Sequence, residues 1–156
     1  MKSINLRNLD NQSILRLYAE LMEELRNRQL IRSSNNPVAD YAEKVVVGYL
    51  RLTRVGKEER GYDALDNRKN KYQIKARRIT RHNKSRQLGV IRNLDEELFD
   101  FLIAVIFDES FNILEMWRIP YRFVKENSRW SDHQNGHIFH VYPDVLASGK
   151  GVARVV

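Results

Sequence analysis

Cysteine is absent from the 156 residues, which excludes a disulfide framework, a thiolate zinc site and a cysteine nucleophile. The longest apolar run, residues 101–107, is far shorter than the roughly 20 residues that cross a bilayer. The opening stretch MKSINLRNLDNQS lacks the apolar core of a signal peptide. Internal repeats and low-complexity linkers are also missing. We therefore expect a single cytoplasmic domain without a membrane partner.

Acidic residues are scarce in one part of the chain. Between Arg51 and Arg92 there are 14 Lys and Arg residues against 4 Asp and Glu, whereas the remainder holds 13 basic and 16 acidic residues. The formal net charge of +7 therefore arises from this one segment. Such clustering favours a polyanion, most simply DNA, as the partner. A solvated basic face that only aids solubility is the alternative explanation.

Hydrophobic periodicity predicts an α/β fold with a mixed sheet flanked by helices. Helices are expected over residues 11–30, 37–50 and 121–126, and strands over 52–55, 99–107, 113–119 and 137–142. Residues 80–97 and 128–136 are predicted to be loops, the first with a short helix. These elements divide the single domain into an N-terminal helical segment (1–33), a core (37–142) and a tail (143–156). We expect the N-terminal helix to serve packing or dimerisation.

Residues 61–79, GYDALDNRKNKYQIKARRI, are predicted to form a hairpin of two short strands around a polar turn at 66–70. Side chains two apart on a strand share a face. The second strand therefore has an outer face of Gln73, Lys75 and Arg77 and a core face of Tyr72, Ile74 and Ala76. Together with Asp63 on the first strand, a carboxylate, an amide oxygen and an ammonium could hold a divalent metal beside a scissile phosphate.

Asp63, nine intervening residues and then Gln73-Ile74-Lys75 resemble the signature of the PD-(D/E)XK, or restriction-endonuclease-like, nuclease superfamily. The resemblance covers residues 37–142 and implies an αβββαβ core, here with an extra N-terminal helix. It also implies a nuclease, of the restriction or repair type, that uses Mg²⁺ or Mn²⁺ to hydrolyse phosphodiester bonds in DNA. Carried over, Asp63 and Gln73 would bind the metal, Lys75 would be the catalytic lysine, and Glu43 the assisting carboxylate on the preceding helix.

Two positions depart from the superfamily pattern. Tyr62 stands where proline is usual, and Gln73 stands where the motif has an acid. A Gln-x-Lys version is typical of the branch that resembles Mrr-type restriction enzymes. Because Mg²⁺ prefers hard oxygen ligands, Asp63, the Gln73 amide and the backbone carbonyl of Ile74 suffice as a donor set. An ammonium beside them would stabilise charge that develops on the phosphate.

The basic residues that follow Lys75 are expected to contact nucleic-acid phosphates. These are Arg77, Arg78, Arg81, Lys84 and Arg86. Cutting both strands of a duplex would favour a homodimer. Two other functions fit the sequence: a non-catalytic nucleic-acid-binding or regulatory protein that keeps the fold, and a protein-interaction module with a merely basic surface.

Overall fold

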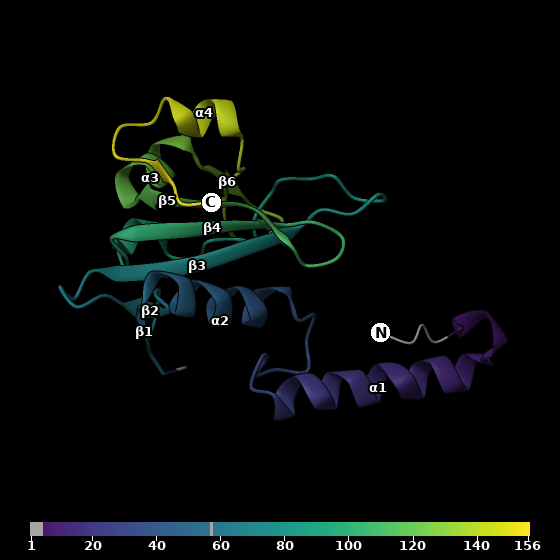
Figure 1. Cartoon of the computed structure of the whole chain (residues 1–156). Helices are drawn as coiled ribbons and strands as arrows, with labels where there is room; N and C mark the ends of the chain where they lie inside the picture. The colour runs from purple at the N-terminus through teal and green to yellow at the C-terminus, as the bar shows by residue number, and fades with distance from the viewer. Residues whose placement is uncertain (1–4, 57) are drawn as a thin grey trace.

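A mixed sheet organises the computed structural model, which describes residues 5–56 and 58–156 (Figure 1). Its six strands lie in the order β1-β2-β3-β4-β5-β8. Their bounds are Thr53–Arg54, Ala64–Leu65, Lys71–Arg78, Phe101–Phe107, Ile113–Pro120 and Ala153–Arg154. β3 and β4 are parallel, and the other neighbouring pairs are antiparallel. The predicted α/β fold with a mixed sheet is confirmed.

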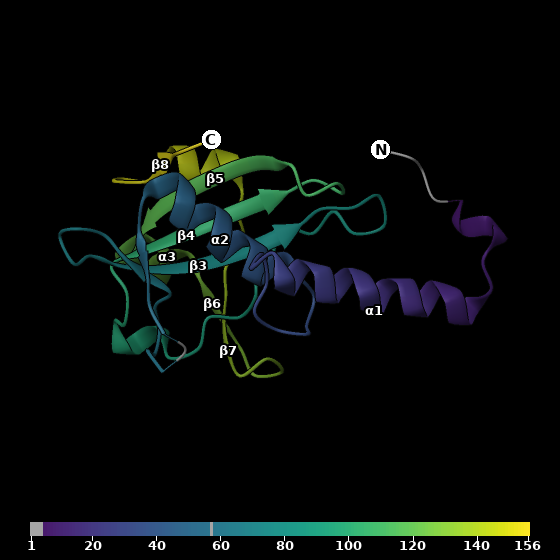
Figure 2. The same cartoon turned by 60° about the horizontal axis from the view of Figure 1, so that its bottom comes forward.

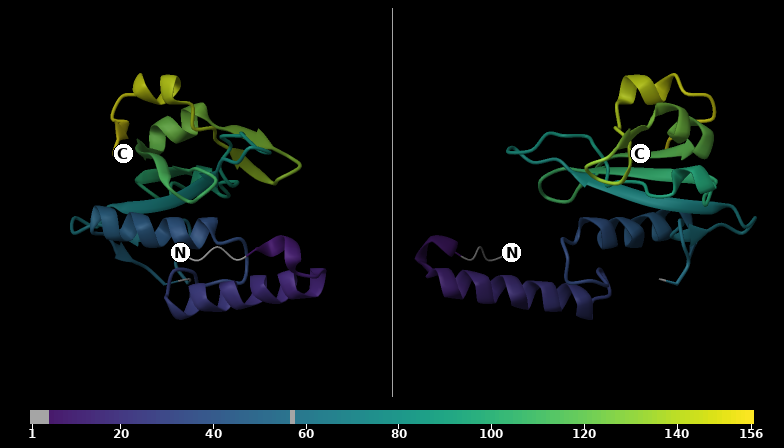
Figure 3. Two further views of the ribbon diagram at one scale, coloured as in Figure 1. Left: turned by 45° about the vertical axis from the view of Figure 1, so that its right-hand side comes forward. Right: turned by 180° about the vertical axis from the view of Figure 1, so that it is seen from behind.

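Helices cover both faces of this sheet. The α-helices are α1 (Asn11–Asn27), α2 (Val38–Leu50), α3 (Tyr121–Asn127) and α4 (Pro143–Ala147), and short 3₁₀ turns occupy Leu6–Asn8 and Leu94–Glu96. α2 lies across one face, whereas α3 and α4 lie over the other (Figure 3). α1 lies beyond α2 and runs outward from the domain (Figures 1 and 2). Within the described residues, no helix has the length and apolar character needed to cross a membrane.

β4 is the centre of the core, as its continuous apolar sequence predicts. Every residue from Leu102 to Phe107 is fully buried. On one face of the sheet, Ile103, Val105 and Phe107 pack with Ala42 and Val46 of α2. The opposite face packs against α3 and α4 through Leu102, Ala104, Ile106, Val124 and Leu146. The alternation of side chains along β3 is also confirmed, because Tyr72 and Ile74 are buried on the α2 side.

The connection between β3 and β4 contains no α-helix, which departs from the expected αβββαβ order. Its regular structure is a 3₁₀ turn at Leu94–Glu96. Leu88, Ile91 and Leu94 are buried against the sheet face opposite α2. The preceding residues are polar and basic, so they offer no continuous apolar stripe that a longer helix could bury. Three apolar side chains at regular spacing cover the sheet in its place.

The C-terminal part is more ordered than the sequence predicts. Within the predicted loop at 128–136, β6 (Arg129–Ser131) pairs with β7 (Gly136–Ile138) in a separate two-stranded ribbon. The strand expected at 137–142 is thus shorter. The predicted tail contains α4 and β8, and β8 pairs with β5. Elements of two to five residues carry too few positions for periodicity to reveal them, so tertiary contacts decide their formation.

Leu146 provides a test of whether this C-terminal part belongs to the core. Its side chain is 1% exposed, whereas that of its neighbour Val145 is 45% exposed. We expect Leu146→Ala to lower the free energy of unfolding by about 2–5 kcal/mol, because it leaves a cavity. Val145→Ala should stay within about 0.5 kcal/mol of the wild type. Urea unfolding followed by circular dichroism measures both, and equal effects would contradict this packing.

Candidate active site

Asp63 joins the two strands of the predicted hairpin. Its Oδ2 accepts hydrogen bonds from the Gln73 side-chain amide at 2.7 Å and from the Ile74 backbone N–H at 2.6 Å. Its own N–H donates to the Tyr72 carbonyl at 2.8 Å. Gly61 turns the chain just before it with φ of +83°, and a Cβ there would lie 2.3 Å from Leu98. The turn at Gly61 and these three hydrogen bonds together hold the Asp63 carboxylate against β3.

The backbone carbonyl of Ile74 faces the same edge of the sheet as Asp63. Along a strand, backbone groups point alternately to the two neighbouring edges. The Lys71 carbonyl accepts from Asp100 on the β4 side, whereas the Tyr72 carbonyl accepts from Asp63 on the β2 side. By the same alternation, Ile74 directs its N–H and C=O toward β2. Pairing with β2 ends at Tyr72, so the Ile74 carbonyl lies beyond it, next to the Asp63 side chain.

Lys75 lies one residue further along β3, partly buried beside a pocket of about 210 Å³. Gln73, Arg60 and Arg92 also line this pocket. Burial lowers the pKa of Lys75; the negative charge of Asp63 opposes this shift, and the positive charge of Arg92 adds to it. Among the described residues, its ammonium has no carboxylate within 4 Å. The lysine therefore faces a solvent pocket next to Asp63 without being locked in an ion pair.

Glu43 reaches the site from α2, but it is held by two arginines. Its Oε2 accepts hydrogen bonds from Arg32, at 2.6 Å, and from Arg54. Glu43 and Asp63 line a second pocket of about 240 Å³. Burial raises the pKa of Asp63, the hydrogen bond from Ile74 opposes this, and the negative charge of Glu43 adds to the rise. Glu43 thus lies on α2 near Asp63 and influences it electrostatically, and its assisting role stays a prediction.

The donor atoms suit a hard divalent cation. Gln73 directs its NH₂ group toward Asp63 Oδ2, so its Oε1 is not used in that contact and would turn toward a cation bound by Asp63 and the Ile74 carbonyl. Three oxygen donors, with water completing the shell, meet the requirement of Mg²⁺. The described residues contain no cluster of three or more His, Cys, Asp or Glu side chains arranged for a metal. Position 73 is an amide, and the carboxylates that line the second pocket are Asp63, Glu43, Asp40 and Glu59.

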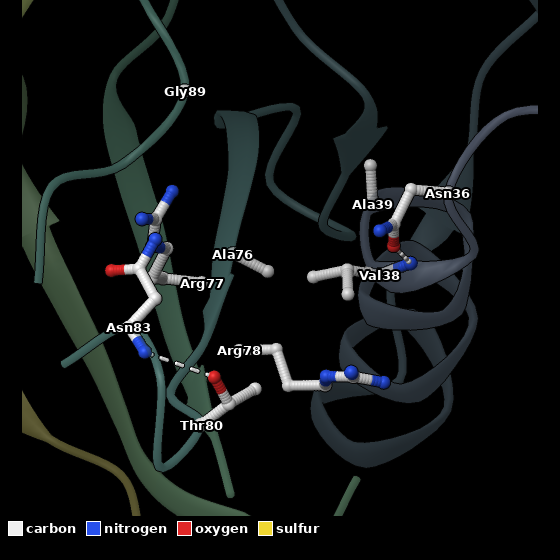
Figure 4. Close-up of a pocket in the computed structure, with 9 residues that line it drawn as sticks. All are labelled: Asn36, Val38, Ala39, Ala76, Arg77, Arg78, Thr80, Asn83 and Gly89. Atoms are coloured by element: carbon white, nitrogen blue, oxygen red, sulfur yellow. Dashed lines mark hydrogen bonds between the residues drawn. The ribbon is translucent and has the colours of Figure 1, made fainter. Parts of the chain in front are cut away.

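The basic residues expected to contact nucleic acid fall into two groups. Arg77 and Arg78 line a pocket of about 400 Å³ at the end of β3, where Arg78 extends toward α2 and Arg77 lies beside the following loop (Figure 4). Arg81 and Lys84 are exposed on that loop. Arg86 is different, because it is partly buried and its guanidinium bonds to Glu115, at 2.6 Å, and to the Val141 carbonyl. Its guanidinium holds the loop to β5, and its contact with nucleic acid stays a prediction.

Four arginines at the site were not predicted. Arg32 and Arg54 bind Glu43, and Arg60 and Arg92 line the Lys75 pocket. Arg60 and Arg92 belong to the basic segment, so its charge count was the available signal. Arg32 lies outside that segment in an irregular stretch, and no pattern in the sequence links it to α2.

Comparison of the sequence with known proteins leaves the family open. No protein-family model matches the chain, and no significant match was found among curated proteins. The resemblance to the restriction-endonuclease-like superfamily therefore rests on the Asp63 and Gln73-Ile74-Lys75 pattern and on the geometry around it.

Burial of Lys75 leads to a prediction about stability. Because its pKa is lowered in the folded protein, we expect Lys75→Met to raise the urea midpoint at neutral pH. Between the lowered pKa and the ordinary value of 10.5, the unfolded chain holds a proton that the folded protein has lost. Wild-type stability therefore rises with pH across that window, and the advantage of methionine shrinks.

The control is Lys44→Met, since Lys44 is exposed on α2. It should leave the urea midpoint close to that of the wild type at every pH. A Lys75→Met protein that is less stable than the wild type at neutral pH would contradict the assigned environment of Lys75.

Proposed function

We propose that the chain is a nuclease that uses Mg²⁺ or Mn²⁺ to hydrolyse phosphodiester bonds in DNA. The observation that carries this proposal is the convergence of Asp63, Gln73 and Lys75 at one open edge of the sheet. Asp63 touches both Gln73 and Ile74, and its charge acts on Lys75. Gln73 and Lys75 line one pocket and Asp63 lines a second, so solvent reaches both sides of the Asp63–Gln73 hydrogen bond.

The roles of the residues follow from their chemistry. Asp63, Gln73 and the Ile74 carbonyl would hold the cation, which when bound supplies Lewis-acid stabilisation of the charge on the phosphate. The lowered pKa of Lys75 makes its neutral amine more accessible, so it can accept a proton from the attacking water. In its ammonium form it stabilises negative charge on the phosphate. Arg60 and Arg92, in the same pocket, can donate hydrogen bonds to phosphate oxygens.

A path for the DNA strand leads away from this centre along β3. Arg77 lies two residues beyond Lys75, about 7 Å along a strand, beside the pocket of about 400 Å³. None of the nine described residues that line this pocket is acidic. Arg77 uses its Nε on the Ser85 carbonyl, which leaves the outer nitrogens of the guanidinium for a ligand. A phosphate next to the scissile one would therefore meet a positive surface.

Cleavage assays test the catalytic proposal. Plasmid and single-stranded DNA should be cut by the wild type with Mg²⁺ or Mn²⁺ and left intact with EDTA. Lys75→Ala and Asp63→Asn should each lower the rate by about 10²–10³-fold or more, since each removes one stabilising group. Lys44→Ala and Asp66→Asn, both outside the site, are the matched controls.

Two results would overturn the nuclease proposal. One is wild-type cleavage by either site variant, since a contaminating enzyme or another site would then be responsible. The other is tight DNA binding by the wild type without cleavage under any of these metals, which would identify a non-catalytic binding protein. Weak, salt-independent binding would instead favour a protein-interaction module.

Arg77 tests the proposed DNA path separately from catalysis. We expect Arg77→Ala to weaken DNA binding and to reduce the slope of log affinity against log salt by about 1, because one phosphate contact is lost. Arg122→Ala is the control, since Arg122 is 88% exposed on α3 and pairs with Glu126. Fluorescence anisotropy in EDTA over a range of salt concentrations gives both values. Equal slopes for all three proteins would remove Arg77 from the path.

A further inference from the structure

We propose that α1 is a dimerisation helix that pairs antiparallel with α1 of a second copy of this chain. The helix runs outward from the domain, so most of its length lies away from the sheet and α2 (Figures 1 and 2). Four large apolar side chains are exposed on it: Ile14 (40%), Leu15 (62%), Tyr18 (56%) and Leu21 (55%). A concentration of apolar surface on one projecting helix is typical of an interaction site.

Four apolar residues of α1 have the spacing of a seam, the apolar strip along which two helices pair. Ile14, Tyr18, Leu21 and Leu25 follow one another at intervals of four, three and four, the a and d positions of a heptad repeat. The charged side chains of α1 lie at other heptad positions. Two of them, Glu23 and Arg26, are bonded to each other on the outer side. The seam therefore offers an apolar strip to another helix while the charges stay in water.

A second unpartnered apolar feature lies at the base of the same helix. A groove of about 270 Å³ is lined there by Leu25, Leu30, Ile31, Pro37, Tyr41 and Phe111, all of them apolar or aromatic. A single two-fold rotation axis between the two copies covers both the apolar strip of α1 and the groove. It places Ile14 against Leu25 of the second copy and Tyr18 against Leu21 of the second copy. Each outer half of α1 then lies by the groove of the other copy.

Self-association explains these features better than an unrelated partner. A two-fold interface uses the same patch on both copies, so a seam and a groove on one chain must complement each other. The 17 residues of α1 span only about 25 Å, which is short for a stable pair when specific interfaces bury about 800 Å² per partner. The groove supplies the additional area. The antiparallel orientation also sets the two helix dipoles in opposite directions, which is favourable.

Sedimentation velocity across micromolar concentrations tests the proposal without any substrate, so its outcome is independent of the nuclease proposal. The wild type should sediment as a dimer. Leu21→Glu should sediment as a monomer with unchanged helical circular dichroism, because the side chain is already exposed in one copy. Arg16→Glu, on the charged side, should remain a dimer. A monomeric wild type, or a dimeric Leu21→Glu protein, would overturn the dimer.

The absence of native cysteine allows the orientation to be tested by disulfide trapping. In the antiparallel pair, the double variant Ile14→Cys with Leu25→Cys should form covalent dimers under oxidation. Ile14→Cys alone should not, since the two copies of residue 14 lie at opposite ends of the helix pair. Efficient cross-linking of the single variant would indicate parallel helices and overturn the antiparallel arrangement.

Discussion

One oxygen of Asp63 accepts two hydrogen bonds, and the geometry of the candidate site depends on them. β2 pairs with β3 through only two residue pairs, Ala64 with Tyr72 and Leu65 with Lys71. Beyond these, the carboxylate replaces the missing strand by binding the Ile74 N–H and the Gln73 amide. The same contact that fixes the hairpin therefore sets the positions of the carboxylate and amide oxygens relative to each other and to Lys75.

This arrangement places opposite charges in a partly dry environment. Burial raises the pKa of Asp63 and lowers that of Lys75, so each charged form is disfavoured relative to water. Their mutual attraction only partly offsets these effects. Perturbed carboxyl and amino groups that share a solvent-accessible edge are typical of sites that bind or transform a ligand. A purely structural role would be better served by a closed ion pair, such as that between Arg86 and Glu115.

The convergence at the site could be predicted because it is local. Gln73 and Lys75 share one face of β3, and Asp63 immediately precedes β2, which a short turn joins to β3, so the three residues lie near one another. The ion pair of Arg86 could not be predicted, because it joins residues far apart in the sequence. Those of Glu43 could not be predicted either, because Arg32 and Arg54 lie outside any pattern shared with α2. The charge of the basic segment likewise did not reveal that Arg86 pairs with Glu115, since a count of charges does not distinguish a paired guanidinium from a free one.

In the fold, too, some elements could be predicted from the sequence and others depend on tertiary contacts. The long helices α1 and α2 and the buried strand β4 follow from periodicity and composition, and the structure contains them close to the expected bounds. β6, β7, α4 and β8 are too short to carry a pattern of their own. Their positions depend on what they contact: Leu146 enters the core on the sheet face opposite α2, and β8 bonds to the backbone of β5. Sequence reasoning therefore found the scaffold of the site but not the elements that complete the domain.

The parallel pairing of β3 with β4 has a consequence for how the chain folds. A parallel pair cannot be closed by a tight turn, so residues 79–100 must first loop across the sheet. That connection has no long helix to form early; it is held by Leu88, Ile91 and Leu94 in the core, by backbone hydrogen bonds to residues 137 and 139, and by Arg86. Ordering such a loop costs chain entropy before its contacts form, which slows the folding of parallel strands. Pairing of β3, the strand that bears Lys75, with β4 therefore requires a longer loop to be ordered than pairing of β4 with β5, which a short turn joins.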